Sequence, residues 1–370
     1  MSHTKEHPIL SLIHDHRFIV TLGSGGVGKT TTAVALAVLA AMEGKKVGLL
    51  SIDPAKRLAD AMGIKLGSAL SPIKIPGSDM KGSLHGAMLD QKAVFDEMVD
   101  RWAPSKSIKE KIYENSIYKE VSANLGGPLE YMALAKLQAM SEDDSFDLIV
   151  LDTPPDTHAL DFLERPNALS GFTEGGVMTW LIKPFYLAQK LGAGKLLRAS
   201  GKLMSGISAI TGVKMLQMLA EFLVLMEDVI KGFSKAGNQV TELLKSSQTS
   251  FILVAAPHNA AVRSARGLME ELKRNKFPLG AMLVNRYTPS ELEASIKRCQ
   301  DEGVNAPGLE MLLKKVGYAK DLTGTLRDDV HQFFGTDTPV LRIEEHSKFI
   351  HTLDSVIEFS ETVSHAKVLH

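Results

Sequence analysis

A glycine-rich stretch near the start of this 370-residue chain has the residue types and spacing to bind phosphate. Residues 22–32 are LGSGGVGKTTT, with four residues between Gly23 and the run Gly28, Lys29 and Thr30. In a loop of this pattern, backbone N–H groups converge on phosphate oxygens, and glycine permits positive φ angles and close approach. Lys29 would contact the β- and γ-phosphates, and the Thr30 hydroxyl would ligate Mg²⁺. The pattern therefore predicts a phosphate and magnesium site over Gly23, Ser24, Gly25, Gly26, Val27, Gly28, Lys29 and Thr30.

Two aspartates at the ends of apolar runs could complete the chemistry. Asp53 follows VGLLSI (47–52), where it could orient or deprotonate an attacking water; the alternative is a carboxylate that caps the turn at Pro54. Asp152 follows FDLIVL (146–151), a pattern typical of a carboxylate that binds Mg²⁺ through water. The residues after it form a stiff turn that could switch with the γ-phosphate: Thr153, Pro154 and Pro155.

A third apolar run ends in an amide. Asn285 and Arg286 close the run AMLV (281–284), and an amide can both donate to and accept from the edge of a base. Without the other motifs, one amide at the end of a strand is weak evidence for a base-binding site.

The elements that must position these residues indicate a doubly wound α/β fold. The run 18–22 (FIVTL) suits a buried strand, and 29–43 favours a helix that ends at Gly44. Strand, loop and helix N-terminus follow in the order that an anion site requires. Continuous apolar runs predict a mainly parallel sheet covered on both faces, with strands at 18–22, 47–52, 146–151, 251–255, 281–284 and 340–343.

Two long connections predict a separate helical subdomain, made of residues 90–143 and 167–247. The α/β core then comprises 17–89, 144–166 and 248–346, and residues 347–370 form a C-terminal helix and tail. A methionine stripe in the second insertion suits either a core or a flexible apolar binding surface. Its members are Met178, Met204, Met215, Met218 and Met226.

Composition narrows the classes of partner. The net charge is −1, which favours neither nucleic acid nor an anionic membrane as a partner. The single cysteine, Cys299, excludes an internal disulfide. No stretch has the character of a signal peptide or a membrane span, so we expect a cytoplasmic protein.

With these motifs, the chain resembles the arsenite-pump and guided-entry ATPase family, a branch of the deviant-Walker-A P-loop ATPases. The stretches that carry the resemblance are GSGGVGKTTT, SIDPAKRLADAMG and LDTPPDTHALDFLERP; VNR (284–286) and PVLRIEE (339–345) match by position and character only. The resemblance implies a P-loop NTPase fold, ATP and Mg²⁺ as cofactors, and a dimer that sandwiches nucleotide. It also implies residue roles: Asp53 positions water, Asp152 is the second switch aspartate, Thr31 contacts the α-phosphate, Asn285 reads adenine, and Pro339 lies on the adenine wall.

The chain departs from the family pattern in three places. Ser24 replaces a signature lysine that crosses the dimer to the partner's phosphates, and its hydroxyl is too short and uncharged to act there. The sequence is most similar to a bacterial subgroup in which serine is the normal residue, and Lys56 and Arg57 are the nearest cations that could act instead. Cys299 alone cannot form a three-thiolate arsenite site, and no Cys-x-x-Cys pair is present to clamp a dimer with zinc.

The leading hypothesis is an ATPase whose helical subdomain binds an apolar client or a membrane-associated partner. It would act as a homodimer or as a heterodimer with a paralogue. The alternatives are a positioning ATPase that works on DNA or membrane, a subunit of a metalloid pump, and a nucleotide sensor that barely hydrolyses. The tail 348–370 is amphipathic but not basic, which disfavours the positioning ATPase.

Overall fold

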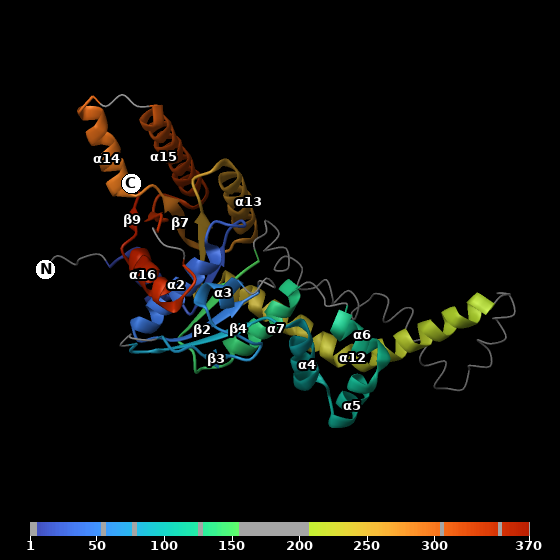
Figure 1. Ribbon diagram of the computed structural model, residues 1–370. Coiled ribbons are helices and arrows are strands. Elements are labelled where there is room, and N and C mark those ends of the chain that lie inside the picture. The colour runs from blue at the N-terminus through green and yellow to red at the C-terminus, as the bar shows by residue number, and fades with distance from the viewer. Residues whose placement is uncertain are drawn as a thin grey trace. The chain divides into compact units, whose positions relative to one another are not determined.

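The computed structural model describes residues 6–52, 57–75, 80–124, 129–154, 207–303, 307–346 and 350–369 (Figure 1). The chain divides into two compact units. The first consists of Met1–Leu89, Met140–Asp161 and Glu242–His370, and the second of Asp90–Ala139 and Phe162–Thr241. All the strands found among the described residues belong to the first unit.

A nine-stranded sheet forms the centre of the first unit as described, in the order β3-β4-β2-β5-β1-β6-β7-β8-β9. Neighbours from β4 to β8 pair in parallel, whereas the short edge strands β3 and β9 pair antiparallel. The sheet confirms the predicted α/β fold class. The strands are β1 (Phe18–Leu22), β2 (Lys46–Ser51), β3 (Ser71–Pro72), β4 (Ser83–Met88), β5 (Leu148–Asp152), β6 (Thr249–Ala255), β7 (Leu279–Tyr287), β8 (Val340–Glu344) and β9 (Lys367–Val368).

The central strands are buried along their whole length. Every residue of β1, β5 and β6 is buried, as expected of parallel strands covered on both faces. Continuous apolar runs reveal such strands, and each of the six predicted strands coincides with an observed one. The apolar pattern does not reveal β4, because glycine and polar residues interrupt its sequence SLHGAM.

Helix α2 (Lys29–Met42) begins directly after the glycine-rich loop and is buried on nearly all sides. Alanine, valine and leucine make up most of it, so it packs closely against the sheet. Its C-cap is Glu43, the next residue, Gly44, adopts a φ of 101°, and the N–H of Lys45 donates to the carbonyl of Ala40 at 3.0 Å. The left-handed conformation explains why the predicted end at glycine is confirmed.

The C-terminal residues contribute to the core of the first unit. Helix α16 (Leu353–Ser364) packs against α2 and buries Val356, Phe359 and Val363, and β9 pairs with β8. The described part of 347–370 is therefore an integral layer of this unit, because one face of α16 is apolar at helical spacing. Helix α15 packs against β7, α13 packs against β6, and both α13 and α14 pack against α15 (Figure 1). The remaining helices of this unit are α1 (Pro8–Asp15), α3 (Arg57–Met62), α13 (Asn259–Asn275), α14 (Ser290–Asp301) and α15 (Pro307–Phe334).

The second unit is helical in its described residues. Trp102 on α4 lies edge-on to Phe233 on α12, with ring centroids 6.4 Å apart, and Gly232 leaves the room that the indole needs. Of the methionine stripe, Met226 is buried and Met218 is 39% exposed, whereas Met178 and Met204 lie outside the described residues. The helices are α4 (Gln91–Trp102), α5 (Lys106–Glu114), α6 (Ser116–Asn124), α7 (Leu129–Ser141) and α12 (Ile207–Lys245).

None of the helices in the described ranges has both the length and the apolar character to cross a bilayer.

Candidate nucleotide-binding site

The glycine-rich loop joins β1 to α2 at the carboxyl end of β1. Gly26 and Gly28 adopt left-handed φ angles of 81° and 92°. Gly28 is the N-cap of α2 and offers no side-chain cap, which leaves the first turn's N–H groups available to an anion. A Cβ at Gly23 would lie 2.5 Å from the Val254 carbonyl oxygen, and one at Gly28 would strike the Asn285 amide. Both glycines are therefore required by close packing.

Lys29 makes a buried ion pair at the centre of the site. Its side chain is 4% exposed, and its ammonium donates to Oδ1 of Asp152 at 2.7 Å and to the carbonyl of Thr153. Asp152 is fully buried, and its Oδ2 accepts from the Ser51 hydroxyl at 3.0 Å. A buried pair of this kind makes each partner essential, since removal of one leaves the other charge uncompensated.

The sheet register explains why these groups meet. β5 lies between β2 and β1, and its Asp152 pairs with Ser51 on one side and Thr21 on the other. Three polar residues thus form one row across the carboxyl ends of three strands, the edge where ligands bind in open α/β sheets. Thr153 is fixed to the same row because its hydroxyl donates to the Thr21 carbonyl at 2.8 Å.

Asn285, on β7, holds the glycine-rich loop in place through a hydrogen bond from its side chain. Its side chain is 6% exposed, its Nδ2 donates to the Val27 carbonyl at 2.9 Å, and its Oδ1 accepts from the N–H of Arg286. The strand register shifts between Val284 and Tyr287, and the exposed Arg286 adopts a φ of 56°. This irregularity turns the amide onto the loop. Its contact with adenine remains a prediction, because the amide bonds to the chain itself here.

The structure does not bring Pro339 to this cluster. Pro339 precedes β8, and its carbonyl accepts from the N–H of Met282 at 3.0 Å, three residues before Asn285 on the neighbouring strand. Ser24, Thr30 and Thr31 lie in or beside the loop and are half-buried. Asp53, Lys56 and Pro155 lie outside the described residues, as does the side chain of Arg57.

The comparisons with known proteins agree with this geometry. Residues 16–305 match the family model described as anion-transporting ATPase. The chain belongs to the anion-transporting ATPase family.

Relatives of this anion-transporting ATPase family member carry ATPase names. The chain is 28% identical over 285 residues to an "ATPase ASNA1 homolog" of Entamoeba dispar. This match covers 74% of this chain and 77% of the relative. It is 25% identical over 316 residues to "ATPase GET3" of Kluyveromyces lactis, with 81% of each chain covered. It is 28% identical over 270 residues to "ATPase ASNA1 homolog 2" of Paramecium tetraurelia, with 73% and 75% covered. The predicted family and ATPase activity are confirmed.

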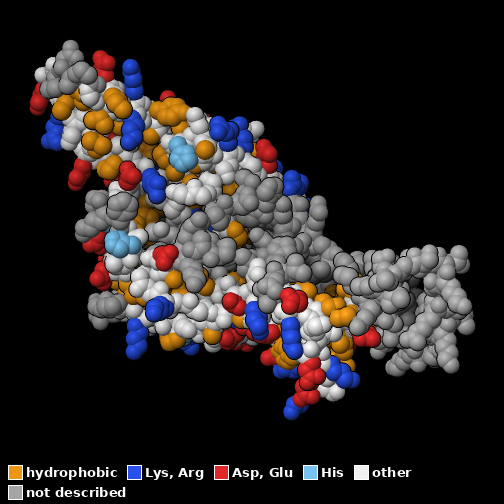
Figure 2. Space-filling model, turned by 45° about the vertical axis from the view of Figure 1, so that its right-hand side comes forward, with side chains coloured by type: hydrophobic (Ala, Val, Ile, Leu, Met, Phe, Trp, Pro, Cys, Tyr) orange, Lys and Arg blue, Asp and Glu red, His pale blue; other side chains and the backbone are white. Residues whose placement is uncertain are grey.

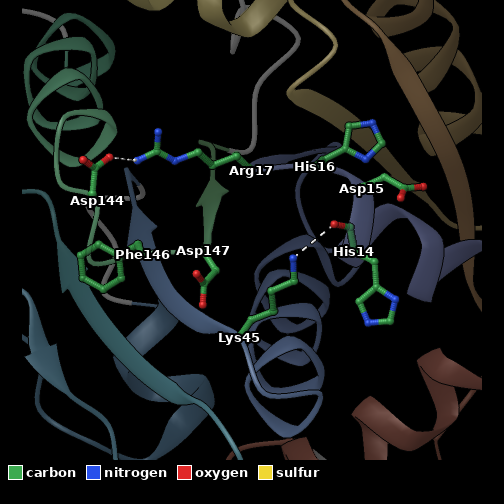
Figure 3. A pocket seen from close by; sticks show the side chains of 8 residues that line it. All are labelled: His14, Asp15, His16, Arg17, Lys45, Asp144, Phe146 and Asp147. Carbon is green, nitrogen blue, oxygen red and sulfur yellow. Dashed lines mark hydrogen bonds and ion pairs between the residues drawn. The ribbon is translucent and has the colours of Figure 1, made fainter.

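A pocket of this ATPase lies at the amino ends of the strands, away from the glycine-rich loop at their carboxyl ends. Figure 3 shows a pocket of about 380 Å³ lined by residues that precede β1, β2 and β5. Arg17 points toward Asp144, 3.7 Å away, and Lys45 donates to the His14 carbonyl at 3.2 Å. The predicted site residues do not line this pocket, which is a shallow surface of mixed charge.

Sequence reasoning missed two residues of the central row, Thr21 and Ser51. Each is a polar residue at the end of an otherwise apolar strand run, FIVTL and KVGLLS. That interruption was the available signal. Most buried hydroxyls have a hydrogen-bond partner, and here the partners are the Leu151 carbonyl for Thr21 and the Asp152 carboxylate for Ser51.

Proposed function

We propose that this ATPase binds Mg–ATP at the loop, dimerises around the nucleotide and couples ATP binding and hydrolysis to the binding of an apolar client by its helical unit. The buried cluster of Lys29, Asp152 and Asn285 around the loop carries the proposal. It combines an anion-binding backbone with a cation, a carboxylate and an amide, as a nucleotide requires.

The residues of the loop fit Mg–ATP by their chemistry. The first-turn N–H groups and Lys29 would bind phosphate oxygens, with Thr31 toward the α-phosphate and Asn285 and Arg286 toward adenine. Thr30 would ligate Mg²⁺ directly and Asp152 through water, and hard oxygen donors are what this cation prefers. When bound, Mg²⁺ neutralises charge that develops between the β- and γ-phosphates.

The remaining catalytic roles belong to the segment after β2. Asp53 would orient the attacking water. Arg57, or failing that Lys56, would supply the cation that Ser24 cannot, since a guanidinium fork suits phosphate oxygens. The competing possibility is that hydrolysis proceeds slowly without a cation from the partner, with the cycle set by client binding.

The helical unit offers apolar surface for a client. Met218 and Leu219 on α12 are each 39% exposed, beside a small apolar cluster of Ala220, Leu223 and Val224. A hollow of about 330 Å³ has Val94, Met98, Trp102, Ala135 and Ala139 among its lining residues. On the part of the surface that Figure 2 colours by residue type, basic and acidic side chains are interspersed, which disfavours a nucleic-acid partner.

Client capture by a hydrolysis-slow variant tests this function. Asp53→Asn loaded with Mg–ATP should retain a fluorescent apolar helix of about 20 residues through gel filtration. Lys29→Ala, which should not load ATP, is the matched control and should release it. Equal retention by both variants, or retention by neither, would contradict coupling of ATP to client binding.

A further inference from the structure

The hydroxyl of Ser51 has no role in the mechanism above, although it touches the residue at its centre. Ser51 is fully buried at the carboxyl end of β2 and donates to Oδ2 of Asp152 at 3.0 Å. The main chains are tied at the same point, because the N–H of Ile52 donates to the Asp152 carbonyl at 2.9 Å. Ser51 therefore sits where β2 leads into the segment that contains Asp53.

The two oxygens of Asp152 are held by different kinds of donor. Lys29 holds Oδ1 with a charged ammonium, and Ser51 holds Oδ2 with a neutral hydroxyl on a neighbouring strand. Lys29 is also the group that must bind the β- and γ-phosphates, which compete with Asp152 for its protons. When the ammonium turns to phosphate, the carboxylate loses its stronger donor, and the described contact that still fixes its side chain is the bond from Ser51.

We propose that Ser51 is a positioning residue that holds the Asp152 carboxylate in place while Lys29 transfers from Asp152 to the phosphates. The carboxylate would then stay oriented by Ser51, and its Oδ1 would be available to accept from a water on Mg²⁺ when that ion is bound. Groups that orient a metal's outer ligands contribute strongly to metal affinity. This inference rests on the proposed function, because it requires Mg–nucleotide at the loop.

Another serine of the same sheet provides the comparison. Ser250 on β6 is fully buried like Ser51, but its Oγ has no hydrogen-bond partner among the residues that the structure describes. Ser250→Ala removes a hydroxyl oxygen from a buried parallel strand, as Ser51→Ala does, but leaves the contacts of Asp152 unchanged. Comparison of the Ser51 and Ser250 variants therefore separates the loss of the bond to the Asp152 carboxylate from the general effect of replacing a buried serine.

The test is the affinity of fluorescent ADP for nucleotide-free protein, measured with Mg²⁺ and with EDTA. We expect wild type and Ser250→Ala to bind ADP more tightly when Mg²⁺ is present. In EDTA, the ADP affinity of Ser51→Ala should match that of wild type and Ser250→Ala within about twofold. Ser51→Ala should need about 10-fold more Mg²⁺ to reach half of the gain in ADP affinity, as expected for a residue that orients a metal ligand. Ser51→Cys, which keeps the volume but is a weak donor, should behave as Ser51→Ala does. Thermal unfolding of each variant verifies that it is folded.

The outcomes separate this inference from the proposed function. If wild type shows no effect of Mg²⁺ on ADP binding, the proposed function fails and the inference fails with it. If wild type shows the effect and Ser51→Ala shows it at the same Mg²⁺ concentration, the inference alone is overturned. An equal loss in Ser250→Ala would overturn it as well, since that serine does not contact Asp152.

Discussion

At the residue scale, Lys29 has two sets of partners that exclude each other. In the structure it pairs with Asp152 and the Thr153 carbonyl inside a site that is nearly closed to solvent. In the proposed complex it pairs with phosphates instead. In that complex ATP binding would break a buried ion pair and would release the carbonyl of Thr153, where the predicted switch turn begins.

From the ion pair between Lys29 and Asp152 we predict how the Lys29→Ala substitution changes the stability of the nucleotide-free protein. Lys29→Ala leaves the Asp152 carboxylate buried without its cation, so the free energy of unfolding should fall by about 3 kcal/mol. Adding Asp152→Asn to that variant removes the stranded charge and should recover part of the loss. Urea unfolding measures both. A Lys29→Ala protein as stable as wild type would show that the pair does not form.

A second prediction concerns Asp53. Asp53→Asn should bind ATP as wild type does and hydrolyse it about 10²-fold more slowly or worse, as expected when a water-orienting group is lost. Single-turnover hydrolysis measures the effect. Normal turnover in this variant would make Asp53 a turn residue beside Pro54.

Sequence alone predicts the loop because its function depends on spacing within one short segment. The close packing of the loop on Asn285 is not encoded in any local pattern, since the bond from Asn285 to the Val27 carbonyl joins residues 258 positions apart. The bond from Ser51 to Asp152 likewise joins residues 101 positions apart, so the sequence signals a polar residue in an apolar run but not its partner. The place of Pro339 beside adenine, suggested by motif position, stays a prediction; the structure shows only that Pro339 directly precedes β8.

At the scale of elements, apolar runs predict the buried parallel strands, and helix-forming residues that end at a glycine predict the helix after the loop. What sequence cannot show is which helix covers which. α16 closes over α2 from the far end of the chain, and β4 enters the sheet although its composition does not favour a strand. Such choices follow from packing among elements that are distant in sequence.

The contact between α13 and α15 makes a prediction at this scale. Arg266 on α13 donates to both oxygens of Asp329 on α15, which is 6% exposed. Arg266→Ala should lower the free energy of unfolding by more than the control variant does, because a charge-assisted bidentate contact to a buried carboxylate is lost. The control is Arg327→Ala, whose partner Asp328 is 68% exposed, and its effect should stay below about 1 kcal/mol. Equal losses in the two variants would contradict this assignment.

At the scale of the whole molecule, each chain carries one glycine-rich loop of this pattern. A nucleotide that lies in a two-fold interface links its own binding to association. We therefore predict a dimer that tightens with Mg–ATP, seen as a concentration-dependent shift in sedimentation velocity, and no such shift in Lys29→Ala. A strict monomer under all nucleotide conditions would contradict self-association around nucleotide.

The central claim is that nucleotide binds at the Lys29 loop, and calorimetric titration of Mg–ATP into wild type and Lys29→Ala tests it most directly. The account predicts saturable binding of one ATP per chain in wild type and a loss of at least about 10-fold in affinity in Lys29→Ala, since the main cation on the β- and γ-phosphates is gone. An unchanged affinity in Lys29→Ala would place the nucleotide elsewhere and contradict the account.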